Sequence, residues 1–121
     1  MSANRINRIN DEIQRELSDL LRTVKDPRVQ GTMISITRVD TTSDLRYTRV
    51  YVSFLQEERA KEAMAGLRSA AGYLRSQLGR NLGLRISPEI VWNLDDSITY
   101  GAKMLKLINS LETGHDESEQ E

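Results

Sequence analysis

The hydrophobic pattern changes period four times along the chain, and this order limits the folds that the chain can adopt. From Ile6 to Val24, apolar residues recur every three or four positions, the spacing of one face of an amphipathic helix. The sequence Lys25-Asp26-Pro27 follows, and a proline disfavours helical geometry in the residue before it. We therefore expect a first helix that ends by Lys25.

Three later segments have the two-residue alternation of β-strands. Residues 33–40 (MISITRVD) are rich in β-branched side chains, and residues 47–54 (YTRVYVSF) alternate apolar with polar or aromatic positions. These two segments predict a hairpin. Residues 89–94 (EIVWNL) follow Pro88 and predict a third strand whose buried face is formed by Ile90, Trp92 and Leu94.

Gly72 lies inside a stretch that otherwise has helical spacing. We expect two helices that meet at this glycine, because the apolar positions before and after it head in different directions: Ala60, Met64, Leu67 and Ala71, then Tyr73, Leu74, Leu78 and Leu82. A glycine in a continuous helix costs roughly 1 kcal/mol relative to alanine. If the chain bends there with a positive φ, Gly72→Ala lowers stability and Gly72→Val obstructs the bend.

The last part of the chain divides into a helix and a tail. Asp95-Asp96-Ser97 offers N-cap oxygens for a final helix with apolar positions Ile98, Met104, Leu105, Ile108 and Leu111. The last ten residues contain five acids and no large apolar side chain, a composition typical of disorder. For these 121 residues we expect one folded domain over 1–111 and a disordered acidic tail over 112–121.

The net charge of −1 conceals a basic folded part. Without the five acids of the tail, 13 acidic side chains remain against 17 basic ones. No acid occurs between Glu62 and Glu89, and four arginines lie in that interval: Arg68, Arg75, Arg80 and Arg85. A solvated helix surface normally mixes both signs, so the missing acids favour a nucleic-acid partner. The alternative is that Gly72 only caps a helix and that the arginines are solvated.

Several classes of function have no support in the sequence. The chain lacks cysteine, and His115 lies in the predicted tail, so neither thiolate chemistry nor a nucleophile activated by histidine can be assembled. Asp95 and Asp96 are adjacent, a spacing that rarely converges on one metal ion. We expect no enzyme, cofactor, metal site, small-molecule substrate or membrane partner. The expected protein is a cytoplasmic monomer.

Three motifs resemble those of the ribosome-binding factor A family: KDPRVQG after the first helix, SAAGYLRSQLGRNLGLRISPEIVW, and LDDSI. The resemblance extends to about Leu111. It implies an α+β domain of type II KH topology (α-β-β-α-α-β) with a three-stranded sheet, a C-terminal helix, and an interhelical Ala-x-Gly kink in place of the usual Gly-x-x-Gly. It also implies a ribosome biogenesis factor that binds the immature small (30S) ribosomal subunit and its 16S rRNA and assists late rRNA processing.

Small residues at the predicted kink would leave the first amides of the second helix free for a phosphate oxygen. Arginines on both sides would extend this site along the RNA backbone. A second basic group, on the loop after the first helix and on the hairpin, either contacts RNA or serves solubility. The predicted RNA-binding residues are Arg68, Ala70, Ala71, Gly72, Arg75, Ser76, Arg80, Arg85, Lys25, Arg28, Arg46 and Arg49.

The alternative function is a protein-interaction module that docks through the first amphipathic helix. The polar face of that helix mixes both signs, as an ordinary solvated surface does, with Arg5, Arg8, Asp11, Glu12, Arg15, Glu16, Asp19 and Arg22. RNA affinity that falls steeply with salt would favour the RNA-binding hypothesis. Capture of a protein without RNA would favour the alternative.

Overall fold

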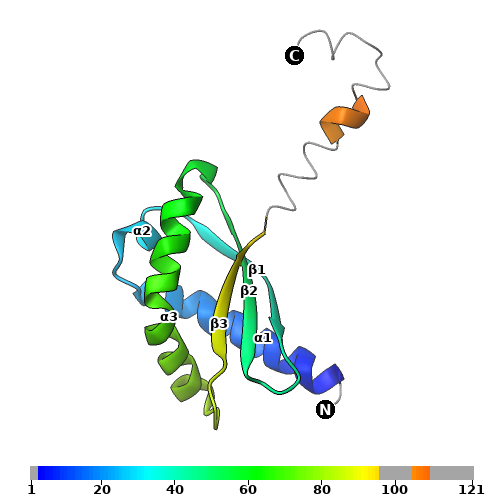
Figure 1. Cartoon of the computed structure of the whole chain (residues 1–121), viewed down its shortest axis with the longest axis vertical. Helices are drawn as coiled ribbons and strands as arrows, with labels where there is room; N and C mark the ends of the chain where they lie inside the picture. The colour runs from blue at the N-terminus through cyan, green and yellow to red at the C-terminus, as the bar shows by residue number, and fades with distance from the viewer. Residues whose placement is uncertain (1–2, 96–104, 110–121) are drawn as a thin grey trace.

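The computed structural model describes residues 3–95 and 105–109, in which two long helices pack on one face of a small sheet (Figure 1). The predicted first helix, hairpin, following helical region and third strand are confirmed in that order. The elements are α1 (Ala3–Leu20), the 3₁₀ turn η1 (Leu21–Thr23), α2 (Pro27–Gln30), β1 (Ile34–Thr41), β2 (Tyr47–Phe54), the 3₁₀ turn η2 (Glu57–Arg59), α3 (Ala60–Leu82) and β3 (Glu89–Leu94).

The sheet has the order β1-β2-β3 and combines both kinds of pairing. β1 and β2 form the predicted antiparallel hairpin, with Val39 opposite Val50. β3 pairs with β2 in parallel, with Trp92 opposite Val50. A parallel neighbour needs a crossover connection, and α3 provides it. The end of α3 and the start of β3 therefore lie at the end of the sheet where β2 begins.

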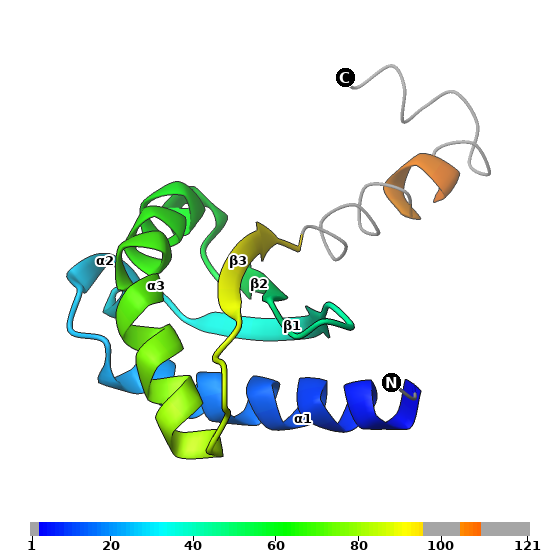
Figure 2. The ribbon, with the colours of Figure 1, turned by 60° about the horizontal axis from the view of Figure 1, so that its bottom comes forward.

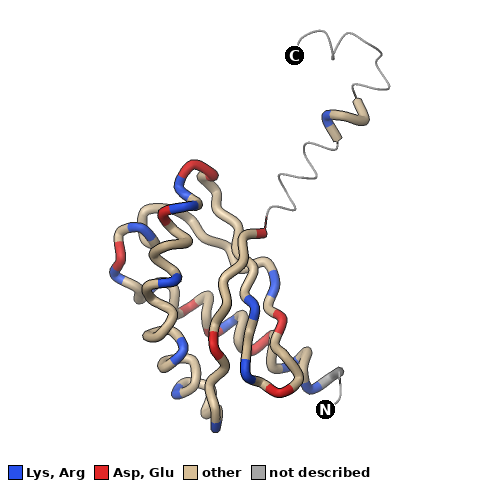
Figure 3. The backbone as a smooth tube through the Cα atoms, viewed as in Figure 1, with Lys and Arg blue, Asp and Glu red and all other residues tan. Residues whose placement is uncertain are grey.

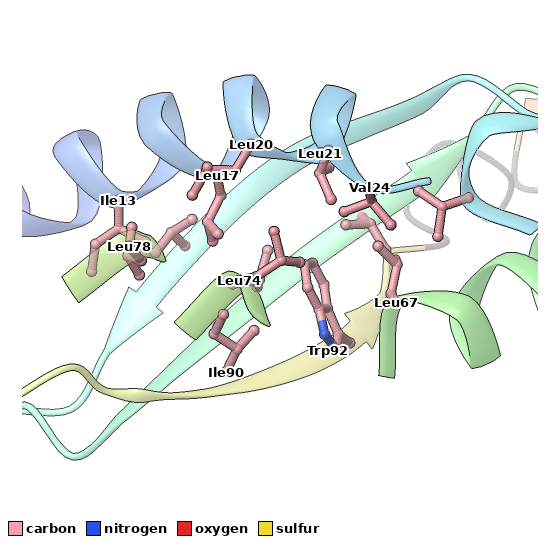
Figure 4. Packing of buried hydrophobic residues seen from close by; sticks show 14 of the residues in the cluster. Ile13, Leu17, Leu20, Leu21, Val24, Leu67, Leu74, Leu78, Ile90 and Trp92 are labelled. Carbon is pink, nitrogen blue, oxygen red and sulfur yellow. The ribbon is translucent and has the colours of Figure 1, made fainter. Parts of the chain in front are cut away.

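The core lies between the sheet and the helices, which cover the same face (Figure 2). Figure 4 shows side chains from α1, α3 and β3 meeting there. Trp92 is 7% exposed, which confirms its predicted place in the core, whereas Leu94 at the end of β3 is 49% exposed. The buried hydrophobic residues are Ile13, Leu17, Leu20, Leu21, Val24, Val29, Val39, Val50, Val52, Ala63, Met64, Leu67, Leu74, Leu78, Ile90 and Trp92.

The two helices predicted on either side of Gly72 are one continuous α-helix, α3, and this corrects the sequence interpretation. Figure 2 shows α3 changing direction partway along its length, so the bend lies within a helix and does not separate two helices. The apolar positions explain the continuity, because they form one stripe with steps of three and four residues: Ala60, Met64, Leu67, Ala71, Leu74, Leu78 and Leu82. Of the described glycines only Gly83, at the C-cap, has a positive φ.

α2 was not predicted, because its four residues are too short for a periodic signal. At the other end of the chain, residues 105–109 are helical. The rest of the predicted last helix and the acidic tail lie outside the described residues. Asp95, a predicted N-cap, accepts a hydrogen bond from the Thr37 hydroxyl on β1, and the residues that it would cap lie outside the described ones.

Candidate nucleic-acid interface

The exposed side of α3 combines arginine with small residues. Arg68, Gly72 and Arg75 are all exposed, and their spacing of four and three residues places them on one side of the helix. A Cβ atom built on Gly72 would meet no heavy atom within 4 Å. Ser69 and Ser76 are also exposed. We call the surface formed by Arg68, Ser69, Gly72, Arg75 and Ser76 the α3 ridge. No packing contact requires the glycine there.

The loop after α3 holds one arginine of the ridge in place. The Nε atom of Arg75 donates a hydrogen bond to the Ser87 carbonyl oxygen at 3.0 Å, and the Ser87 hydroxyl donates to the Arg75 carbonyl oxygen at 2.7 Å. The close approach depends on Gly79, because a Cβ atom there would lie 2.8 Å from Cβ of Ser87. The guanidinium group of Arg75 is thus oriented by the fold and still exposed to solvent.

The loop between α1 and α2 lies beside the ridge. A hollow of about 410 Å³ separates this loop from α3 and includes Lys25, Ser69 and Tyr73 in its lining. The hydroxyl oxygens of Thr23 and Tyr73 are 2.8 Å apart and join the two walls. The structure therefore brings Lys25, predicted on a separate basic group, next to the α3 ridge.

Arg28 mainly positions α2 against α3. Its Nη2 atom lies 2.6 Å from Oδ2 of Asp26 and donates to the Ser69 hydroxyl at 3.3 Å. Hydrogen bonds from the Arg28 side chain, and then from its backbone amide, lower the pKa of Asp26 from 3.8. The same pair raises the pKa of Arg28. Since Asp26 offsets much of its charge, Arg28 attracts a phosphate less than Lys25 does.

More basic residues gather at the far end of α3. Arg80 lies in the last turn of the helix, and Arg85 lies in the exposed loop that follows. The Glu89 amide donates to the Arg46 carbonyl oxygen at 2.8 Å, which brings the hairpin to this end as well. Figure 3 shows basic positions recurring down α3 and into the loop after it. From Arg68 to Arg80 this track is about 18 Å long.

Three other predicted site residues are not part of the exposed α3 ridge. Ala70 and Ala71 are half-buried, and Ala70 packs against the core. Arg49 is on the outer face of the sheet and forms an ion pair with Asp40 at 3.3 Å. The prediction of free amides after Gly72 is wrong. In the continuous helix α3, these amides donate hydrogen bonds within the helix.

Sequence reasoning missed three hydroxyl-bearing residues of this region, Thr23, Ser69 and Tyr73. Two of them could have been found from spacing. Ser69 and Tyr73 are followed by Ser76 and Arg80 at steps of four, three and four residues, which predicts that all four lie on one side of a helix. The contact of that side with the α1–α2 loop could not be found from spacing, because it depends on tertiary packing.

Within residues 3–95 and 105–109, no cluster of three or more metal-ligating side chains occurs. Among the described helices, none is both long and apolar enough to cross a membrane.

Comparisons with known proteins identify the family. The sequence profile of the family described as ribosome-binding factor A matches residues 5–108. A ribosome-binding factor A from Acetivibrio thermocellus is 50% identical over 107 residues, which cover 87% of this chain and 86% of the relative. The corresponding protein of Caldanaerobacter subterraneus subsp. tengcongensis is 45% identical over 109 residues, or 88% of each chain.

Solved structures have the same fold. A Thermotoga maritima protein assigned to ribosome-binding factor A superimposes with a TM-score of 0.67 at 36% identity, over 77% of this chain and 89% of that one. A homology model of Thermus thermophilus ribosome-binding factor A, fitted into an electron-microscopy map of a complex with 30S, also superimposes, with a TM-score of 0.61 at 23% identity, over 72% of this chain and 91% of that one. Profile, sequence relatives and fold agree that this chain belongs to the ribosome-binding factor A family.

Proposed function

We propose that this protein binds rRNA of the immature small ribosomal subunit through the α3 ridge and assists late maturation of that RNA without catalysis. It acts in the cytoplasm as a monomer. Arg68 and Arg75 contact phosphates across the open surface at Gly72, and Lys25 extends the contact on one side. Arg80, Arg85 and Arg46 extend it at the other end of α3.

The observation that carries this proposal is Gly72. A glycine in a helix interior costs about 1 kcal/mol relative to alanine, and here no neighbouring atom offsets that cost. Close approach of an RNA strand to the helix would explain the glycine, because a Cβ atom at position 72 would stand between the RNA and the helix backbone. The arginines on the same side and the absence of acids between Glu62 and Glu89 match a phosphate backbone in charge.

A binding factor of this kind works through differential affinity. If the α3 ridge fits one arrangement of the immature RNA better than another, bound protein shifts the equilibrium toward the arrangement that fits. Maturation that removes the preferred arrangement then lowers the affinity and releases the protein. No reacting group is needed for either step.

Charge reversal on the α3 track tests the proposal. We expect the Arg68→Glu and Arg80→Glu variants to weaken co-sedimentation with immature small subunits and to reduce the salt dependence of binding by about one unit per lost contact. Arg75 is less suitable, because its side chain also holds the loop at Ser87. Arg15→Glu is the matched control, since Arg15 is an exposed arginine on α1.

Equal weakening by Arg15→Glu would mean that binding follows net charge, and the ridge would lose its assignment. Capture of a ribosomal protein that persists after nuclease treatment would favour the alternative of a protein-interaction module that docks through α1. Side chains of α1 form hydrogen bonds with other helices and strands of the fold, among them those of Asn10, Gln14 and Glu16.

For the domain boundaries we propose a binding unit over 1–111 followed by an acidic tail over 112–121. The five acids of the tail would repel phosphates, so the tail does not contribute to RNA binding.

A further inference from the structure

An apolar groove lies at the end of the sheet where β1 begins and β2 and β3 end. It has a volume of about 640 Å³. Three of its lining residues are large, apolar and unusually exposed: Met33 at 67%, Leu55 at 76% and Leu94 at 49%. This end of the sheet is opposite to the one that carries Arg46 and Arg85, so the groove is separate from the proposed RNA track.

A second exposed apolar surface belongs to the helical residues 105–109. Leu105 is 63% exposed, Leu107 is 54% exposed and Ile108 is 44% exposed. Three large apolar side chains in five residues leave this helical segment with much uncovered apolar area. Covering such area in water is favourable at about 25 cal/mol per Å².

We propose that residues 105–109 dock in this groove, so that the chain covers its own exposed apolar patch. The two surfaces are joined by a short tether. Leu94 and Asp95 line the groove, and only nine residues separate Asp95 from Leu105. An extended segment of that length spans at most about 35 Å, so the helix always remains within reach of the groove.

The tether makes this occupant more favourable than a separate molecule. A short covalent connection gives the segments that it joins an effective mutual concentration in the millimolar range, which exceeds the concentration of most free partners. Docking within the chain therefore needs only modest contact energy to outcompete a second copy.

The groove and the helical segment also carry complementary charges. Glu57 and Glu58 line the groove, and the helical segment carries Lys106 between its apolar residues. Lysine near these carboxylates gives the docked helix a preferred direction and register, and the carboxylates disfavour an acidic occupant. The five acids of residues 112–121 follow directly, so docking holds the start of that tail at the end of the sheet away from Arg46 and Arg85.

Cysteine pairs test the proposal cleanly, because the full chain contains no cysteine. Ser35 lines the groove, so Ser35→Cys is combined with Ile108→Cys, and disulfide formation is followed in a glutathione redox buffer at low protein concentration. The matched control combines Ile108→Cys with Ser43→Cys. Ser43 is also exposed, but it lies in the hairpin turn at the other end of β1.

We expect the groove pair to form an intramolecular disulfide at least about tenfold faster than the control pair, at a rate independent of protein concentration. Adding Lys106→Glu should slow the groove pair, and adding Glu58→Lys to that variant should restore the rate. Equal rates for the two pairs would overturn the proposal. A dimer whose formation accelerates with concentration would also overturn it, and would assign the groove to a second copy.

Discussion

Gly66 and Gly72 lie less than two turns apart on α3, and their surroundings are opposite. A Cβ atom on Gly66 would lie 2.9 Å from Cγ2 of Val29 and 3.1 Å from Cβ of Arg28, so this glycine lets α2 pack directly against α3. A Cβ atom on Gly72 would meet nothing within 4 Å. Both positions have the same helical backbone, so conformation alone cannot explain both glycines.

The fold requires a glycine at position 66 but not at position 72. At Gly66 the helix loses propensity and gains the contact with α2, which brings Lys25 and Arg28 beside the α3 ridge. At Gly72 no contact with another described residue compensates for the same loss. Substitutions at the two positions should therefore affect different properties, stability at the first and binding at the second.

The largest effect that we expect is on stability, from Gly66→Val. Atoms closer than 3.0 Å must move, and Val29 is buried with little room to do so. Overpacking of this kind typically costs 1–3 kcal/mol. Unfolding in urea measures the loss, with Gly72→Val as the matched control, since valine there meets open space. Equal stability of the two variants would contradict the comparison.

Next in size is the effect of Gly72→Val on binding. On the proposed function, a branched side chain at the centre of the ridge holds the RNA backbone away from the helix, and we expect at least about tenfold weaker co-sedimentation with immature small subunits, which is about 1.4 kcal/mol. The melting temperature should change little. If Gly72→Val binds as the parent does, the phosphate contact lies elsewhere on the chain.

A smaller effect, of opposite sign, is expected from Gly72→Ala. The sequence interpretation predicted a loss of stability, because it assumed a positive φ. In the continuous helix α3, alanine should instead stabilise the protein by up to about 1 kcal/mol. Thermal unfolding measures this shift. A clear destabilisation would mean that the backbone at Gly72 is not ordinary helix.

Much of the fold could be predicted because its signals are local. The alternation in residues 47–54 and 89–94 identified β2 and β3 with the bounds that the structure has. Pro27 marked the end of the first helical segment for a steric reason that acts within two residues. The break at Gly72 was wrong, because a single glycine was given more weight than an apolar stripe that continues across it.

The candidate site was only partly predictable. Arg68, Arg75 and Arg80 were found from the missing acids, which is a sequence property. The position of Lys25 beside Ser69 was not, because it depends on α2 folding back against Gly66, a contact between residues more than thirty positions apart. Arg49 carries the same charge as the others, but its partner Asp40 could be identified only from strand register.

The smallest expected effect is that of acid on α2, which packs on the Gly66 side of α3. Asp26 caps α2 by accepting a hydrogen bond from the Arg28 amide at 2.9 Å, and its pKa is below 3.8 in the folded protein. A lowered folded pKa means that this stabilisation is complete above the unfolded value and is lost as pH falls through the folded value. Below about pH 4, the protection of the Gln30 and Gly31 amides, measured relative to their intrinsic exchange rates at the same pH, should therefore fall before the core opens.

The variant Asp26→Asn keeps a cap oxygen but cannot change its charge, so it should make the protection of the α2 amides nearly independent of pH in this range. The pKa of Asp44 is also lowered, first by a hydrogen bond from the Thr42 hydroxyl and then by one from the Arg46 amide. Asp44→Asn is therefore the matched control, because it removes a similar carboxylate from the hairpin turn and should leave α2 unchanged. If α2 remains sensitive to acid in the Asp26→Asn variant, a group other than Asp26 controls how α2 is held against Gly66.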